Sequence, residues 1–435
     1  MLRAWRERDW DTAALAAVGV GATVRAVWIL AIHHPFAAQY IYSDMYGYVN
    51  RAKALSLGHI THYAAFYPPG THALIAFPLE LFGRGRSGFW GAAVVWWLLS
   101  SLTPLFAWRL ARLLLSPAAA ALTAVLVSVW PLYILYAGYF TSETPAIAFI
   151  AAALWLGYRA RFGAGRGVLL SAGGAGLLGM AALACRPQLS FNMLILGLPL
   201  LRRRDQLAKA GVLVLGAAVV FAAVVTNNSK ATGKFTPQLN QDTALAFFIG
   251  HCNASFVSTA DNRRQLFFGF GPPPAIEQGT GRVYRFTNRV VWDEGFFYRQ
   301  GLKCIRHDGI GHTTLIVRHL ADMTASSTPW PLIDDKRIRS LAQATNFLYA
   351  LALPVILVAG FLLAREKRRT GRRPTGEGIL LAHFSCVLIV ALFAFGDPRF
   401  RLPYDLFALA LLGAVLAHRY LEQDPGPGEQ LLNSR

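Results

Sequence analysis

Long apolar segments are the feature that most constrains how this chain can fold. Several of them approach the roughly 20 residues that a helix needs to cross the hydrocarbon core of a bilayer. Hydrophobic residues make up 54% of the 435 residues, and the mean hydropathy of +0.39 is too high for an ordinary soluble domain. We therefore expect an all-α polytopic membrane protein with about ten transmembrane helices. The expected spans cover residues 12–33, 88–108, 117–135, 142–158, 167–184, 188–201, 208–226, 343–363, 378–395 and 402–418.

The positive charge of the chain gathers at the ends of these apolar segments. The formal net charge is +19, because 42 Lys and Arg residues outnumber 23 Asp and Glu residues. Basic residues fill every second connection, whereas the connection at 136–143 has neither Lys nor Arg. This alternation predicts a multi-pass inner or plasma membrane protein with both termini in the cytoplasm. We therefore assign the charge to topology and to anionic lipid or phosphate groups, and expect no nucleic-acid partner.

Two regions on the outer side, 34–87 and 227–341, are far longer than ordinary connections. The chain is accordingly expected to have three parts: an N-terminal transmembrane module (1–226) with the long first outer loop, an extracytoplasmic subdomain (227–341), and a C-terminal transmembrane module with a cytoplasmic tail (342–435). Apolar stretches in the first outer loop predict short interfacial helices. Cys252 and Cys304 both fall in the extracytoplasmic subdomain and could form a disulfide there.

A carboxylate lies among aromatic residues shortly after the first expected span. Asp44 is followed by Tyr46 and Tyr48, and the sequence Phe-Tyr-Pro-Pro-Gly occupies residues 66–70. A carboxylate near a membrane surface is partly desolvated, so its basicity can be tuned for proton transfer. We interpret Asp44 as a general base or as a partner for developing positive charge. The structural alternative is that Ser43 or Asp44 caps the following helix. We expect Pro-Pro-Gly to form a turn, beside which Tyr67 could line a pocket.

Further charged residues are expected at the same membrane face. Glu143 stands at the start of the fourth expected span, either as part of a plain helix start or as a second carboxylate facing the same cavity as Asp44. Arg186 is a lone cation in an outer turn, and Arg399 and Arg401 precede the last span among aromatic residues. Arg side chains bind phosphate in bidentate fashion, which suits a phosphate-linked substrate. The alternatives are contacts with lipid headgroups and an ordinary basic-aromatic belt.

One ionisable residue lies at membrane depth. Arg25 is several residues from either end of the first expected span. Ionisable groups at that depth are candidates for a specific role. We therefore expect a structural or phosphate-facing role for Arg25 rather than snorkelling to the surface.

These residues are also where the chain resembles a known family, the GT-C class of integral-membrane glycosyltransferases. The likeness is to the bacterial branch that includes aminoarabinose transferases and protein O-mannosyltransferase-like enzymes, which use polyprenyl-phosphate sugars. The matching pieces are Asp44, Tyr46, Tyr48 and Arg51, then Tyr67 with the Pro-Pro-Gly after it, residues 142–145, Arg186-Pro187, residues 399–404, and the outer segments 227–235 and 292–305.

The resemblance implies a GT-C-like helical bundle and an inverting transfer of a hexosyl or pentosyl group on the extracytoplasmic face. The implied partners are membrane lipids, a polyprenyl-phosphate-linked donor and a lipid, glycan or protein acceptor. Asp44 matches the catalytic Asp of the family's first outer loop. The implied substrate-binding residues are Tyr46, Tyr48, Arg51, Tyr67, Glu143, Arg186, Arg399, Arg401 and Tyr404. Many members carry a second acid directly after the Asp, but Met45 stands here, so no divalent metal or other cofactor is expected.

Two other functions compete with this one. A lipid-linked-glycan transporter or flippase would need a polar path at the membrane midplane and usually internal repeats. The sequence has few charges at mid-span and shows no such repeat. A non-catalytic membrane scaffold would use the outer subdomain as a binding surface, and in that case Asp44→Asn would change nothing.

Overall fold

The computed structural model describes residues 2–165, 167–252, 254–256, 275–277, 283–284, 294–324, 328–369 and 375–421. Trp292, where one of the segments that resemble the GT-C class begins, lies outside the described residues. The described chain is helical apart from a small antiparallel sheet, in which β2 (Ala275–Glu277) pairs with both β1 (Ala254–Phe256) and β3 (Val283–Tyr284).

The α-helices follow one another along the chain, and shorter helical turns lie between some of them. They are α1 (Leu2–Ala26), α2 (Ser43–Leu55), α3 (Pro69–Leu81), α4 (Arg86–Leu114), α5 (Pro117–Val129), α6 (Pro131–Tyr136), α7 (Glu143–Phe162), α8 (Gly167–Cys185), α9 (Ser190–Leu201), α10 (Leu207–Thr232), α11 (Thr243–His251), α12 (Glu294–Asp308), α13 (Gly311–Thr324), α14 (Arg339–Arg369), α15 (Gly376–Phe393) and α16 (Pro398–Tyr420).

Each of the ten segments expected to span the membrane falls on helices of the structure. Among the described residues, seven helices are long and apolar enough to cross a membrane: Asp9–Ile32, Arg86–Leu114, Gly167–Cys185, Arg204–Thr232, Arg339–Arg369, Gly376–Phe393 and Pro398–Tyr420. The segments around α5 and α9 are apolar but shorter. The helical membrane architecture is therefore confirmed, whereas the count of ten spans stays a prediction.

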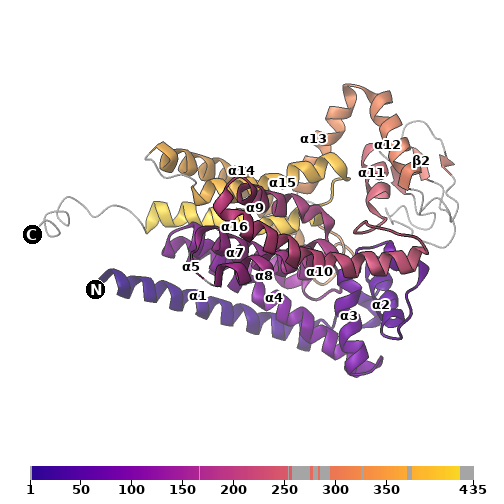
Figure 1. The fold of residues 1–435 in the computed structure, drawn as a ribbon, viewed down its shortest axis with the longest axis horizontal. Helices are drawn as coiled ribbons and strands as arrows, with labels where there is room; N and C mark the ends of the chain where they lie inside the picture. The colour runs from indigo at the N-terminus through magenta and orange to yellow at the C-terminus, as the bar shows by residue number, and fades with distance from the viewer. Residues whose placement is uncertain are drawn as a thin grey trace, which may run out of the picture.

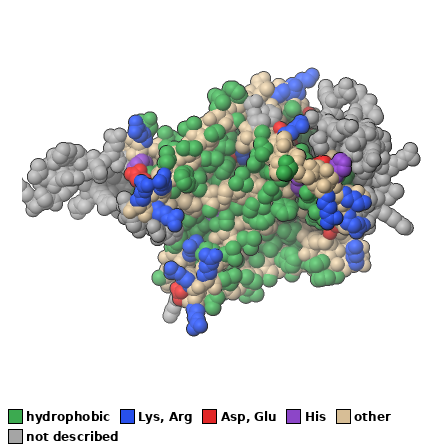
Figure 2. Space-filling model, turned by 90° about the horizontal axis from the view of Figure 1, so that it is seen from above, with side chains coloured by type: hydrophobic (Ala, Val, Ile, Leu, Met, Phe, Trp, Pro, Cys, Tyr) green, Lys and Arg blue, Asp and Glu red, His purple; other side chains and the backbone are tan. Residues whose placement is uncertain are grey.

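The long helices run roughly along the long axis of the molecule (Figure 1). The N-terminus of α1 and the last turn of α16 lie at one end, and α2, α3, α11 and α12 lie at the other. Figure 2 shows hydrophobic side chains over the middle of one face, with Lys and Arg toward the two ends. An apolar belt between two charged ends is what a protein surrounded by lipid requires, because charged groups are excluded from the hydrocarbon region.

Arg25 ties α1 to the end of α5. Its guanidinium donates to the carbonyl oxygens of Val127 at 3.1 Å and Ser128 at 2.7 Å, and the side chain is fully buried. The residue four after Val127 is Pro131, which has no N–H, so the Val127 carbonyl lacks its usual helical donor. Arg25 supplies that donor, which gives it the structural role among the two expected.

In their described parts, the two regions expected on the outer side contain helices at one end of the bundle (Figure 1). The first outer loop contains α2 and α3, as the interfacial-helix prediction required. In the second region, a disulfide between Cys252 and Cys304 joins the end of α11 to α12, with the two Cα atoms 5.2 Å apart. The possible pairing of these two cysteines is therefore confirmed. α10 continues to Thr232, past the module boundary expected at residue 226.

Candidate functional site

Asp44 lies where three distant parts of the chain meet. One oxygen of its carboxylate accepts a hydrogen bond from the Tyr67 hydroxyl at 2.8 Å. The other accepts from Arg399 Nη1 at 2.9 Å, and this ion pair is only slightly exposed. The structure thus joins the start of α2, the bend before α3 and the first turn of α16. It brings together three residues that the sequence analysis selected separately.

The backbone around Asp44 is unusual. Ser43 has a φ of +47° and is the only non-glycine residue with positive φ in the part of the chain that the structure describes. That conformation is unfavourable for a residue with a Cβ and is often found at functional sites. Tyr42 occupies the N-cap position of α2, and no side chain caps the helix. The alternative in which Ser43 or Asp44 caps the helix is therefore wrong, and the carboxylate points to Tyr67 and Arg399 instead.

Tyr67 is held by the helix that follows it. The Pro-Pro-Gly segment begins α3, with Pro69 in the first turn, so it is a helix start and not the turn that was expected. Gly70 packs directly on the end of α8. A Cβ at this position would lie 2.7 Å from the carbonyl oxygen of Ala184 and 2.8 Å from Sγ of Cys185. This close approach fixes Tyr67 beside the α8 terminus, next to which Arg186 lies.

α2 contributes two more of the expected residues. The Tyr48 ring lies 5.1 Å from the Tyr67 ring, and the Arg51 guanidinium lies 4.8 Å from the centre of the Tyr67 ring. Burial and the charge of Asp44 raise the pKa of Tyr67 well above its usual value, so Tyr67 remains a neutral donor to Asp44. Asp44, Tyr48, Arg51, Tyr67 and Arg399 together form what we call the Asp44 cluster. Tyr46 is 58% exposed and is not part of this cluster.

Arg186 and Glu143 form a second ion pair. The two side chains are nearly buried, at 7% and 2% exposure, and Glu143 is the first residue of α7. The Arg186 guanidinium lies 5.4 Å from the centre of the Phe400 ring, and the Arg399 guanidinium lies at the same distance from that ring. Phe400 therefore places the two ion pairs, Arg186–Glu143 and Arg399–Asp44, next to each other.

The segment before α14 covers Arg399. The Trp330 ring lies 4.9 Å from the Arg399 guanidinium. Tyr42 donates to the carbonyl oxygen of Pro331 at 3.1 Å, and Tyr136 donates to that of Trp330. These contacts hold an aromatic ring over the cation. The sequence analysis did not select Trp330, since nothing local distinguishes it from an interfacial aromatic residue.

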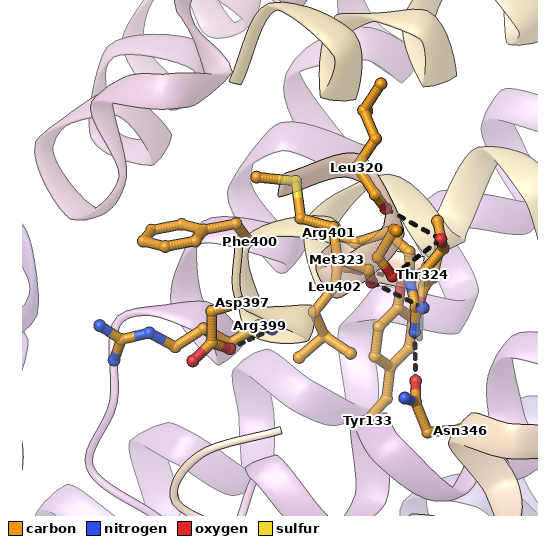
Figure 3. A network of polar contacts seen from close by, with 12 residues as sticks. Tyr133, Leu320, Met323, Thr324, Asn346, Asp397, Arg399, Phe400, Arg401 and Leu402 are labelled. Carbon is orange, nitrogen blue, oxygen red and sulfur yellow. Dashed lines mark hydrogen bonds and ion pairs between the residues drawn. The ribbon is translucent and has the colours of Figure 1, made fainter. Parts of the chain in front are cut away.

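Arg401 lies outside this cluster. Figure 3 shows its side chain directed away from that of Arg399, although both come from the first turns of α16. Arg401 is fully buried, pairs with Asp405 at 2.9 Å, and donates to Asn346 at 2.7 Å and to the carbonyl oxygen of Met323 at 3.0 Å. Arg401 was expected to bind phosphate together with Arg399, but its guanidinium is used to connect α16 to α13 and α14.

Tyr404 makes a structural hydrogen bond inside the helix bundle. Its hydroxyl donates to the carbonyl oxygen of Gln188 at 3.0 Å, and the side chain is fully buried. Gln188 in turn donates from Nε2 to the carbonyl oxygen of Phe400 at 2.9 Å. The two bonds join the start of α16 to the turn after Arg186. They orient the elements that carry the two guanidinium groups.

The structure adds one carboxylate that the sequence analysis missed. Asp242 precedes α11, and its N–H donates to the carbonyl oxygen of Phe66 at 3.1 Å. Burial and the charge of Asp44 raise the pKa of Asp242 to about 7, against the opposing charges of Arg399 and Arg51. An Asp just before an apolar helix is typical of an N-cap, so no local sequence signal indicates that Asp242 lies near Asp44.

The donor set also bears on metal binding. Within the residues that the structure describes, no three His, Cys, Asp or Glu side chains are grouped so that they could hold a metal ion. The two acids of the candidate site, Asp44 and Asp242, face Arg399 and Arg51. Independence from metal stays a prediction.

One family model matches the chain. Residues 67–229 match the family described as dolichyl-phosphate-mannose-protein mannosyltransferase. This range includes Tyr67, Glu143 and Arg186 and ends in α10. No curated protein sequence matches the chain.

Solved structures of two membrane enzymes are similar to this chain, and the archaeal one shares its fold. The oligosaccharyltransferase of Archaeoglobus fulgidus in the apo form has 14% identity and a TM-score of 0.53, and the match covers 97% of this chain and 52% of that one. The same archaeal enzyme, AglB, in complex with an inhibitory peptide and a dolichol-phosphate, gives 13% identity and a TM-score of 0.51, over 97% and 53% of the two chains. ArnT from Cupriavidus metallidurans bound to undecaprenyl phosphate has 15% identity and a TM-score of 0.39, and the match covers 93% of this chain and 77% of that one.

The chain spans about half the length of the archaeal enzyme that it matches. The shared fold covers nearly all of this chain, and the family match covers the part that carries the start of α3, all of α7 and the end of α8. The resemblance drawn from the sequence is thereby confirmed: residues 67–229 match the mannosyltransferase family model, and the chain shares the fold of the archaeal oligosaccharyltransferase.

Proposed function

We propose that this protein moves one sugar, with inversion, from a polyprenyl-phosphate donor to a lipid, glycan or protein acceptor at the extracytoplasmic face of the membrane. The observation that carries the proposal is the meeting of Asp44 with Arg399, beside the pair of Arg186 and Glu143. AglB forms a complex with a dolichol-phosphate, which is of the same chemical class as the lipid phosphate of the proposed donor.

The cations of the candidate site suit the leaving group of such a reaction. A sugar that departs from a phosphate leaves negative charge on the phosphate oxygens, and fixed cations lower the energy of that charge. Arg399 and Arg186 are both mostly buried, and both lie against Phe400. Their attraction to phosphate is therefore screened less by water than at an open surface. We assign donor phosphate binding to these two residues.

The acids of the candidate site suit the acceptor. As the acceptor oxygen attacks the anomeric carbon opposite the phosphate, its proton must pass to a base. The site offers carboxylates for this step, Asp44 among them. Because phosphate leaves as an anion without protonation, one base and the two guanidinium groups supply the chemistry that the transfer needs.

Charge supports the proposed orientation. Arg109 and Arg112 lie near the end of α4, and Arg159 and Arg161 lie in the last turn of α7. The candidate site lies at the opposite ends of the bundle's helices, at the start of α7 and of α16. By the positive-inside rule, the basic end and both termini belong in the cytoplasm and the site belongs outside.

The test is transfer from a panel of polyprenyl-phosphate sugars, followed by mass spectrometry on purified membranes that carry the wild type or Asp44→Asn. We expect turnover by the wild type and a loss of about 100-fold in the variant, because the Arg399 guanidinium loses the anion that orients it. Asp205→Asn is the matched control, since Asp205 is exposed and lies in the connection between α9 and α10. No consumption of any donor by the wild type would overturn the proposal and favour a transporter or a scaffold.

A further inference from the structure

Asp242 stands at the N-cap position of α11, but its side chain makes no capping hydrogen bond. An Asp at this position ordinarily binds the free N–H groups of the first helical turn. Its backbone is instead held against the first outer loop. Gln241 N–H donates to the carbonyl oxygen of Ala65 at 3.0 Å, and Asp242 N–H donates to that of Phe66 at 3.1 Å. The carboxyl lies near enough to Tyr67 for its charge to act on that hydroxyl, and it does not cap the helix.

The groups that face Asp242 come from three other elements. Asp44 and Arg51 lie on α2, Tyr67 precedes α3, and Arg399 begins α16. Burial and the negative charge of Asp44 raise the pKa of Asp242 to about 7, and the two guanidinium groups limit the rise. A carboxyl that titrates near neutral pH is suited to accept a proton and release it again in each turnover. Asp242 as a whole residue is half-buried.

Asp44 is less suited to that step. Both of its oxygens already accept hydrogen bonds, one from Tyr67 and one from Arg399. A proton on Asp44 would weaken the ion pair that holds Arg399 in place. The contacts therefore suit a mechanism in which Asp44 orients Arg399 and Asp242 accepts the proton.

Building on the proposed function, we propose that Asp242 is the catalytic base that takes the proton of the acceptor hydroxyl. The acceptor oxygen forms its bond to the anomeric carbon as the bond from that carbon to the donor phosphate oxygen breaks. The electron pair of the broken bond leaves on the phosphate, next to Arg399. The hydroxyl proton goes to the Asp242 carboxylate and then to water, so no further reactant is needed.

The test compares kcat/KM against pH for the full-length wild type, Asp242→Asn, Asp242→Glu and the control Asp205→Asn, with the donor identified in the panel. The wild type and control should lose about tenfold in kcat/KM per pH unit below about pH 7, because the base must be ionised. Asp242→Asn should lose the acidic limb and about 100- to 10,000-fold in kcat, with an unchanged donor KM. Asp242→Glu should keep a limb with a displaced midpoint.

Each outcome decides between the two proposals. Wild-type transfer with an Asp242→Asn variant that keeps its kcat and its acidic limb would overturn the assignment of Asp242 and leave the glycosyltransferase proposal standing. Absence of wild-type transfer would instead overturn the proposed function. If Asp242→Asn does not fold, as judged by size-exclusion chromatography, Asp242→Glu decides, because an undisplaced midpoint in that variant would overturn the assignment.

Discussion

Arg399 and Arg401 leave the start of α16 in different directions and bind different partners. Arg399 pairs with Asp44 of the first outer loop at 2.9 Å, and Arg401 pairs with Asp405 of its own helix, also at 2.9 Å. The first pair is partly exposed and lies in the candidate site, whereas the second is fully buried between helices. One helix start therefore supplies both a cation of the candidate site and an anchor for the bundle.

The anchor makes a prediction about stability. Arg401→Met leaves the Asp405 carboxylate buried without its cation, so the free energy of unfolding should fall by about 3–5 kcal/mol. The double variant Arg401→Met/Asp405→Leu should recover much of this loss, because no charge then remains buried. Denaturant unfolding of the purified protein in detergent measures both effects. A fully stable Arg401→Met variant with a raised donor KM would instead assign Arg401 to phosphate binding.

Tyr67 offers a prediction about activity. Tyr67→Phe removes the hydroxyl that donates to Asp44, and a hydrogen bond to a charged acceptor is worth about 1.5–3 kcal/mol. If that energy orients the Asp44–Arg399 pair, kcat/KM should fall by about 10- to 100-fold. The matched control is Tyr46→Phe, since Tyr46 lies on the same helix as Asp44 but is exposed. Equal rates for the two variants would remove Tyr67 from the site.

The charges around Asp242 predict two opposite shifts in pH dependence. Asp44→Asn removes a negative charge that helps to raise the pKa of Asp242, so the acidic limb of the residual activity should move to lower pH. Arg51→Gln removes a positive charge that lowers this pKa, so the limb should move to higher pH. Profiles of kcat/KM between about pH 5 and pH 9 measure both shifts. Shifts in the same direction would contradict the charge arrangement around Asp242.

Much of the architecture could be read from local features. The ten apolar segments all fall on helices because hydropathy and length are properties of contiguous residues. The possible disulfide between Cys252 and Cys304 could be named because only these two cysteines fall in the outer subdomain. The helical period could also have separated Arg399 from Arg401, since residues two apart do not share a helix face.

The sequence by itself determined that this chain forms a bundle of apolar helices, with Asp44, Tyr67, Glu143, Arg186 and Arg399 toward one end of it. Only the tertiary structure decided which of these residues meet: Asp44 with Arg399 and Tyr67, and Glu143 with Arg186. The tertiary structure also places Asp242 near Asp44 and directs Arg401 into contacts with α13 and α14. The physical reason is that hydropathy and helix formation act over neighbouring residues, whereas charge pairing depends on how distant helices pack.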